Sequence, residues 1–276
     1  MSLSHHGKGL AALVGASLLW STGGFFIKSI PLSALTIAGG RSAIAAIVLL
    51  AYIRRPAPTW SLAQWGSILA YVATVVLFVT ATKLTTAANA ILLQYTAPIW
   101  VAIFSALIAK EKLRLIDGVA VAAVMVGMAV FFMERVSADH FAGDVIAILS
   151  GVAFAFVALC MRAQRGVSLP ESILLGNVIT AIVCLPFIDA VPMTSTIVLN
   201  IVLMGVVQLG ISYILYSYAL RYVSAIEAVL ITMLEPLLNP LWVMLAIGEV
   251  PSLYATIGGA IVIGSVVVRG IVVARR

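Results

Sequence analysis

Charged residues are scarce in this sequence. Only 9% of its 276 residues are Asp, Glu, Lys or Arg, whereas 63% are hydrophobic, and the mean hydropathy is +1.19. A soluble domain carries roughly 25% charged residues, and no water-soluble fold could bury this much apolar surface. The solvent for most side chains must therefore be lipid, which excludes most soluble enzymes and favours a transporter.

The side chains that carry most enzyme chemistry are also few. Histidine occurs only at His5, His6 and His140, and the sequence has no H-E-x-x-H motif, no G-x-S-x-G motif and no glycine-rich phosphate loop. These absences argue against an enzyme, a metal centre, a bound cofactor and an ATP-driven pump. Cys160 and Cys184 both lie in apolar stretches, where we expect them to act as small apolar residues and not to form a disulfide.

Ten long apolar stretches fill the chain, and most charges lie in the short links between them. Because about 20 apolar residues cross the hydrocarbon core as a helix, whereas barrel strands alternate in polarity, we predict an all-α membrane protein. We expect Thr86 and Ser224, in two of the links, to cap the helices that follow. The expected spans are residues 9–28, 32–53, 62–83, 86–108, 116–134, 143–162, 170–188, 195–220, 223–246 and 252–272.

The distribution of Lys and Arg predicts the orientation. With a cytoplasmic N-terminus, 11 of the 16 basic residues fall inside, Arg41 falls within a span, and four fall outside, namely Lys28, Lys83, Arg135 and Arg221. The positive-inside rule then puts both termini in the cytoplasm, and this bias explains the net charge of +6 without nucleic acid. Residues 1–8 are too short and too polar for a cleaved signal peptide, so we expect a retained first span.

The two halves of the sequence are related by an offset of 138 residues. Pro98 aligns with Pro236, and Glu111 aligns with Glu249 in the same register. Each half, residues 1–138 and 139–276, then contains five helices. Because five is odd, the second half is inverted relative to the first. Inverted repeats are a transporter architecture, in which the substrate site lies between the halves and access alternates around it.

Several features form a recognisable set. They are ten spans in a 5+5 inverted repeat, Trp20-Ser21 in the first span, Arg41 in the second, Pro98 and Glu235-Pro236 in the fourth helix of each half, and Glu111 and Glu249 after those helices. This set resembles the drug/metabolite transporter superfamily, EamA type, over essentially the whole chain.

Within that superfamily the chain is similar to bacterial inner-membrane exporters of amino acids, including aromatic ones. The resemblance implies a carrier in that membrane, with a small-molecule substrate and no cofactor. The same group carries sugars, drugs and other metabolites, so another such substrate, or a channel-like facilitator, is the alternative. A monomer and a proton as the coupling ion are both compatible with the sequence.

Glu235 is the strongest candidate for a functional side chain. It lies about twelve residues into the ninth expected span, where a charge costs roughly 2.5–3.5 kcal/mol and is usually retained for function. Asn239 follows at i+4 on the same helix face. We expect Glu235 to bind a substrate amine or a proton. The structural alternative is a carboxyl that hydrogen-bonds to a neighbouring helix.

Aromatic and amide side chains within the spans are expected to form the rest of the substrate site, because an aromatic pocket suits ring-shaped or apolar substrates. The structural alternative for each ring is packing in the core or against lipid. The predicted substrate-binding residues are Trp20, Phe78, Gln94, Tyr95, Tyr213, Tyr216, Glu235 and Asn239.

Further residues are expected to shape the helices or to hold them together. Pro98 and Pro236 should bend their helices, and Gly23 and Gly24 should loosen the first one. The predicted structural charges are Arg41, Glu111 and Glu249. Arg41 would donate to backbone carbonyls, and the alternative is that it attracts a substrate carboxylate or pairs with an acid. Glu111 and Glu249 would latch the cytoplasmic face.

Overall fold

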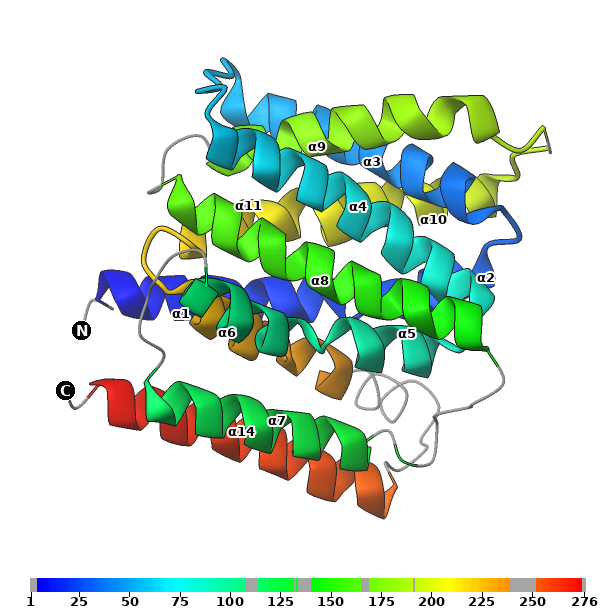
Figure 1. Ribbon diagram of the computed structural model, residues 1–276. Coiled ribbons are helices and arrows are strands. Elements are labelled where there is room, and N and C mark those ends of the chain that lie inside the picture. The colour runs from blue at the N-terminus through cyan, green and yellow to red at the C-terminus, as the bar shows by residue number, and fades with distance from the viewer. Residues whose placement is uncertain are drawn as a thin grey trace.

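The computed structural model describes residues 4–107, 114–131, 133, 140–164, 169–190, 192–238 and 252–274, and these residues form helices and links without a strand. The helices run back and forth in one bundle, so that α1 begins and α14 ends at the same end of it (Figure 1). The elements are α1 (His5–Trp20), α2 (Gly23–Ser29), α3 (Ala34–Ile53), α4 (Leu62–Leu84), α5 (Ala87–Gln94), α6 (Ala97–Leu107), α7 (Leu115–Phe131), α8 (Phe141–Ala163), α9 (Leu169–Cys184), η1 (Leu185–Phe187), α10 (Ser195–Leu203), η2 (Met204–Ile211), α11 (Ser212–Ala219), α12 (Ala225–Thr232) and α14 (Leu253–Ala274).

Apolar side chains cover the outside of the bundle. Ile47, Leu69, Val126, Ile182 and Val268 are each more than half exposed. Five helical segments of the described chain are long and apolar enough to cross a membrane, and shorter apolar helices accompany them. Exposed apolar surface on this scale is stable only in lipid, so the chain is a multi-pass membrane protein. The five segments are Ala34–Ile53, Leu62–Leu84, Phe141–Ala163, Leu169–Phe187 and Ser195–Ala219.

Three of the expected spans are interrupted. The first is interrupted at residues 21–22, between α1 and α2, and the fourth at residues 95–96, between α5 and α6. The ninth is interrupted at Met233, after α12. The breaks precede Pro98 and Pro236, which lie in the first turn of the resumed helices. A proline costs little there, because the first-turn N–H groups have no partner within the helix.

Hydroxyl groups satisfy backbone oxygens at these breaks. Ser21 Oγ donates to the carbonyl of Leu18 at 2.7 Å, and Thr96 Oγ1 donates to the carbonyl of Leu93 at 2.7 Å. Thr232 Oγ1 likewise bonds to a carbonyl of its own helix. Carbonyls left without an amide partner at membrane depth are costly, so these side chains allow the helices to break inside the bundle.

The helix caps predicted from the sequence are confirmed. Thr86 Oγ1 accepts the amide of Asn89 at 3.0 Å, and Ser224 Oγ accepts the amide of Glu227 at 3.2 Å. Each cap satisfies one of the amides that has no partner in the first turn of its helix. The caps therefore define where α5 and α12 begin.

Helices α7 and α14 pack against each other as a pair (Figure 1). Gly127 and Gly258 lie at their contact, and a Cβ on Gly258 would overlap the backbone of Phe131 and the carbonyl of Gly127. Small residues allow such close backbone approach between membrane helices. The Gly258-Gly259 pair therefore holds the two helices together through its first member.

The prediction that Arg221 lies on the side opposite to the N-terminus is wrong. His5 stacks on Tyr222 with ring centroids 5.4 Å apart, and Arg162 donates to the carbonyl of Leu220 at 3.0 Å. The link that contains Arg221 therefore lies at the N-terminal end of the bundle, not at the opposite end. The reason is that an even number of crossings precedes this link, which returns the chain to its starting side.

Polar contacts also join the links at the opposite end. Lys83 Nζ donates to the carbonyl of Ile30 at 2.6 Å. The amide of Ser33 donates to Asp189 Oδ2 at 2.6 Å, and this hydrogen bond lowers the pKa of the Asp189 carboxyl. These contacts tie the last turn of α4 and the link after η1 to the link after α2.

Candidate functional site

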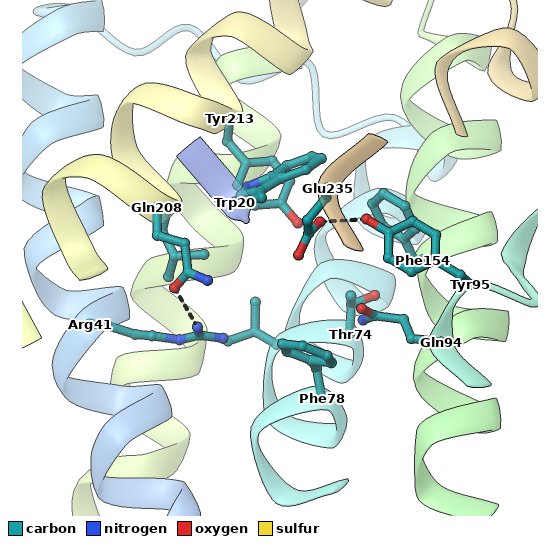
Figure 2. Close-up of a pocket in the computed structure, with 12 residues that line it drawn as sticks. Trp20, Arg41, Thr74, Phe78, Gln94, Tyr95, Phe154, Gln208, Tyr213 and Glu235 are labelled. Carbon is teal, nitrogen blue, oxygen red and sulfur yellow. Dashed lines mark hydrogen bonds between the residues drawn. The ribbon is translucent and has the colours of Figure 1, made fainter. Parts of the chain in front are cut away.

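A cavity of about 50 Å³ lies among the middle turns of the helices. A volume of this size holds a few water molecules, whereas sites that enclose an organic ligand measure roughly 300 Å³ or more. The helix breaks after α1, α5 and α12 lie beside it, as does the π-helical segment η2. The lining residues are Trp20, Arg41, Thr74, Val75, Phe78, Gln94, Tyr95, Phe154, Gln208, Leu209, Tyr213 and Glu235 (Figure 2).

Aromatic rings form one wall of the cavity. Trp20 packs edge-on against Tyr213 with centroids 5.0 Å apart and against Phe154 at 6.1 Å. Tyr216 lies behind this wall, 5.4 Å from Trp20 and 6.0 Å from Phe154. Edge-on and tilted ring pairs are favourable in themselves, so the wall is held in place before any ligand enters.

Glu235 faces the cavity and hydrogen-bonds to Tyr95 (Figure 2). The Tyr95 hydroxyl also lies 2.9 Å from the carbonyl oxygen of Thr232, which ends α12. A phenol has one proton to donate. Both hydrogen bonds can therefore form together only when Glu235 carries a proton and donates it to the Tyr95 oxygen. An ionised Glu235 would compete with the Thr232 carbonyl for the single hydroxyl proton.

Arg41 reaches the cavity from the middle of α3. Its Nη1 atom donates to Gln208 Oε1 at 3.0 Å, and the residue is only 2% exposed. The Gln208 amide occupies the space beside Gly23, where any Cβ would overlap it. Arg41 thus binds a side chain of η2 and not the expected backbone carbonyl. Because Gly23 has no side chain, there is room beside it for the Gln208 amide.

Gln94 lies where α5 ends. Its amide nitrogen donates to Ser150 Oγ at 2.8 Å, and Ser150 donates to the carbonyl of Thr74 at 3.2 Å. This chain of hydrogen bonds connects α5, α8 and α4 on the side of the cavity away from Arg41 (Figure 2). It fixes the orientation of the Gln94 side chain and leaves its carbonyl oxygen as an acceptor.

The cavity brings together most of the predicted substrate-binding residues. Tyr216 is the exception among those described, since it backs the aromatic wall without lining the cavity. Asn239, Glu111 and Glu249 lie outside the described residues. The members of the predicted set that line the cavity are Trp20, Phe78, Gln94, Tyr95, Tyr213 and Glu235.

Other lining residues were missed by the sequence analysis. Phe154, Thr74, Val75 and Leu209 belong to ordinary apolar stretches and carry no signal of their own. Arg41 was expected to be structural, but it lines the cavity. Its position in the middle of a span was the signal that could have identified it, because intramembrane charges are functional by default.

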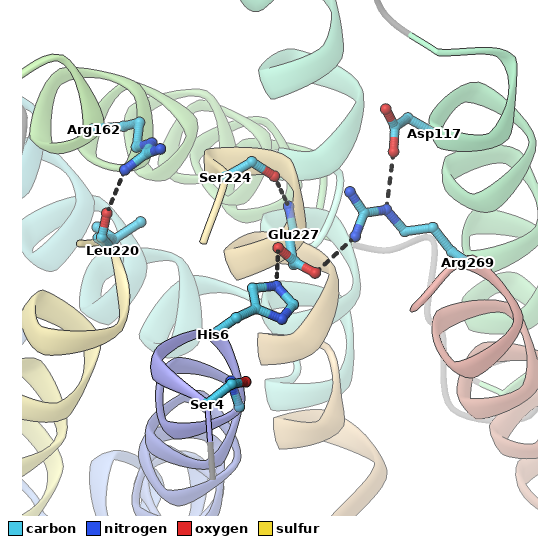
Figure 3. Close-up of polar contacts among 9 residues, drawn as sticks. Ser4, His6, Asp117, Arg162, Leu220, Ser224, Glu227 and Arg269 are labelled. Carbon is cyan, nitrogen blue, oxygen red and sulfur yellow. Dashed lines mark hydrogen bonds and ion pairs between the residues drawn. The ribbon is translucent and has the colours of Figure 1, made fainter. Parts of the chain in front are cut away.

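A polar cluster closes the end of the bundle at which α1 begins (Figure 3). Arg269 of α14 binds Asp117 of α7 at 2.9 Å and Glu227 of α12 at 3.1 Å. Glu227 also contacts Nε2 of His6 in α1 at 3.2 Å. We call these four residues the N-end clasp. Its ion pairs are largely buried, so removing one partner would leave an uncompensated charge.

The opposite end of the bundle has a smaller polar cluster. Asp144 of α8 accepts hydrogen bonds from Thr85 Oγ1 at 2.8 Å and from Asn89 Nδ2 of α5 at 2.9 Å. Lys28 donates to the carbonyl of Thr85 at 2.8 Å. We call Thr85, Asn89 and Asp144 the far-end clasp. The cavity lies between the two clasps, at the middle of the helices.

An apolar bundle with broken helices around a small, charged cavity is typical of a multi-pass membrane transporter. The chain belongs to the EamA-like transporter family, whose model matches it twice, at residues 7–133 and 141–270. It is 25% identical over 94% of its length, and 95% of the relative's, to an "Uncharacterized transporter" of Archaeoglobus fulgidus.

Two further proteins are similar to this chain. "Uncharacterized transporter YdfC" of Bacillus subtilis is 27% identical over 67% of this chain and 62% of its own length. A protein of known crystal structure superposes with a TM-score of 0.80 at 20% identity, covering 97% of this chain and 98% of that one. The last likeness concerns the fold alone.

Proposed function

We propose that this transporter is a secondary carrier that exports small organic metabolites, foremost amino acids including aromatic ones, by alternating access. The observation that carries the proposal is the small central cavity, in which the Glu235 carboxyl group lies beside an aromatic wall. A carboxylate can bind a substrate ammonium group, and a ring can pack on the wall. Because the cavity is smaller than such a substrate, binding has to widen it.

Several observations support two inverted halves, residues 1–138 and 139–276, as the moving parts. The family model matches each half once. Residues 95 and 233, where α5 and α12 end, are 138 positions apart. In the proposed orientation both termini are cytoplasmic and the membrane is the bacterial inner membrane, in keeping with the Lys and Arg bias.

The two clasps support alternating access most directly. His6 and Asp144 are 138 positions apart, and so are Asn89 and Glu227. The contact of His6 with Glu227 at one end is therefore the counterpart of the contact between Asp144 and Asn89 at the other. Equivalent contacts at opposite ends are what an inverted repeat needs if each end opens in turn.

The alternatives are a carrier of another compound, such as a sugar or lipophilic cation, and a channel-like facilitator. The small volume of the cavity favours a carrier, since a channel needs a continuous pore. Glu235 suits a cation as well as an amino acid, so the substrate has to be measured.

The test is uptake into proteoliposomes of labelled aromatic, aliphatic and cationic amino acids, a sugar and a lipophilic cation, with and without an imposed pH gradient. We expect saturable uptake of aromatic amino acids that responds to the gradient. Uptake of only the sugar or the lipophilic cation would disprove the substrate assignment. Uptake that rises linearly with concentration would favour a channel.

A further inference from the structure

We propose that Arg41 is the anion-binding residue of the cavity and that it binds the carboxylate of the substrate. This inference rests on the proposed function, because it assumes that the central cavity contains the transported molecule. It adds an expectation that the carrier assignment alone does not make, namely that an anionic group on the substrate strengthens its binding.

The hydrogen bonds of Arg41 are incomplete. A guanidinium group has five N–H donors. Nη1 binds Gln208 Oε1, whereas Nε is buried and has no partner among the described residues. An unpartnered charged donor at membrane depth is costly, and such residues are usually retained for function. The arrangement therefore lacks an acceptor.

Gln208 determines which edge of the guanidinium group is left for a ligand. With Nη1 occupied, the remaining edge consists of Nε and Nη2, whose N–H bonds point in the same direction. This edge matches the two oxygens of a carboxylate, which Arg binds through paired hydrogen bonds. Gln208 is thus a positioning residue for Arg41, and Gly23 leaves the space that Gln208 needs.

No acid of the described chain supplies the missing acceptor. Glu235 lines the same cavity but hydrogen-bonds to Tyr95, and it forms no ion pair with Arg41 among the described residues. Figure 2 shows the two side chains on different sides of the cavity. Separated opposite charges suit a zwitterion, whose ammonium group would bind Glu235 while its carboxylate binds Arg41. An amine without a carboxylate would leave the Nε and Nη2 edge of Arg41 without an acceptor.

The first experiment compares tryptophan with tryptamine, which has the same ring and amine but no carboxylate. Saturable uptake and competition are measured in proteoliposomes containing wild-type protein, Arg41→Gln or Arg41→Lys. We expect the wild type to prefer tryptophan. Arg41→Gln should raise the KM for tryptophan about tenfold or more, as expected for a lost charged hydrogen-bond pair, and should change the KM for tryptamine little. Arg41→Lys should recover part of the loss, because it keeps the charge without the paired geometry.

Gly23→Ala is the second variant, and it keeps Arg41 in place. The added methyl group meets only the end of the Gln208 side chain, so the helices need not move. We expect Gly23→Ala to raise the KM for tryptophan severalfold and to leave the KM for tryptamine unchanged. If Arg41→Gln does not fold, Gly23→Ala still allows the KM values for tryptophan and tryptamine to be compared.

The outcomes separate this inference from the proposed function. If Arg41→Gln or Gly23→Ala raises the KM for tryptophan and the KM for tryptamine equally, Arg41 is structural and the inference is wrong. The carrier assignment then still stands. If the wild type transports tryptamine with the same KM as tryptophan, the expected preference for an anionic group is wrong. If the wild type transports no amino acid, the proposed function fails and the inference fails with it.

Discussion

At the scale of single residues, the hydrogen bond between Glu235 and Tyr95 depends on whether Glu235 is protonated. One hydroxyl proton serves two oxygens, the Thr232 carbonyl and the Glu235 carboxyl. A protonated Glu235 completes the contact, whereas an ionised one is available for a cation. Proton and substrate would then compete for one carboxyl group, because a neutral carboxyl gains little from a neighbouring ammonium group.

Glu235→Gln tests this competition. Gln cannot ionise but retains a donor for the Tyr95 oxygen. We expect wild-type affinity for an amino acid to fall as the pH is lowered, because protonation removes the negative charge. In Glu235→Gln, affinity should be weak and nearly independent of pH. The measurement is the KM for uptake between about pH 5 and 8, the range in which proteins operate. A variant with the wild-type pH profile would make Glu235 structural.

Tyr216 illustrates the difference between lining a cavity and supporting it. Its ring is fully buried behind Trp20 and Phe154, and its hydroxyl has no partner among the residues that the structure describes. Tyr216→Ala should leave a void and cost about 3 kcal/mol of stability, with weaker substrate binding as Trp20 relaxes. The matched control is Tyr216→Phe, which removes only an unpartnered hydroxyl and should be neutral or slightly stabilising. Thermal unfolding in detergent and the KM distinguish the two. A large loss of stability or of substrate affinity in Tyr216→Phe would reveal a role for the hydroxyl.

At the scale of secondary structure, the helix breaks were predicted only in part. Pro98 and Pro236 indicated bends, but the helices end before them, at residues 95–96 and 233. Proline is most easily accommodated in the first turn of a helix, so it marks where the second segment starts. In both cases that start lies beside the cavity. Tyr95, at the end of the preceding segment α5, then lines the cavity.

The pairing of α7 with α14 gives a sharp test at this scale. A Cβ on Gly258 would meet backbone atoms of Phe131 and Gly127, which cannot move independently of their helix. We expect Gly258→Ala to lower the free energy of unfolding by about 1–3 kcal/mol. Gly259→Ala is the matched control, since its Cβ would have ordinary contacts of 3.8 Å or more, and helix propensity favours alanine. Equal unfolding temperatures for the two variants would contradict the close contact at Gly258.

At the scale of the whole molecule, the two clasps suggest how the ends are controlled. Asp144 accepts two hydrogen bonds at the far end, and its counterpart His6 makes one partly exposed contact with Glu227 at the N-terminal end. Hydrogen bonds to a charged group are each worth roughly 1.5–3 kcal/mol. The far-end clasp should therefore depend more on Asp144 than the N-end clasp depends on His6, because Arg269 still binds Glu227 and Asp117 when His6 is removed.

Asp144→Ala and His6→Ala test this idea as a matched pair. A cysteine introduced at Thr74, which lines the cavity, reports access in a background without Cys160 and Cys184. We expect Asp144→Ala to raise labelling by an impermeant thiol reagent from the far end about tenfold, from the loss of hydrogen bonds to a charge. His6→Ala should raise labelling from the N-terminal end by less. Vesicles of opposite orientation separate the two sides, and equal labelling from both sides in both variants would refute the clasps as gates.

The sequence by itself determined that this is a helical membrane protein and that Trp20, Tyr95 and Glu235 are candidates for its site. Hydropathy, proline and intramembrane charge are local signals, so they can be read without knowing which helices touch. Only the tertiary structure decided that Arg41 and Gln208 meet at the cavity, that Tyr216 lies behind its wall, and that His6 reaches Glu227. These contacts join residues far apart in the chain, and one apolar helix face offers many neighbours of nearly equal hydropathy. Packing, which depends on shape and on the pairing of the few polar groups, chooses among them.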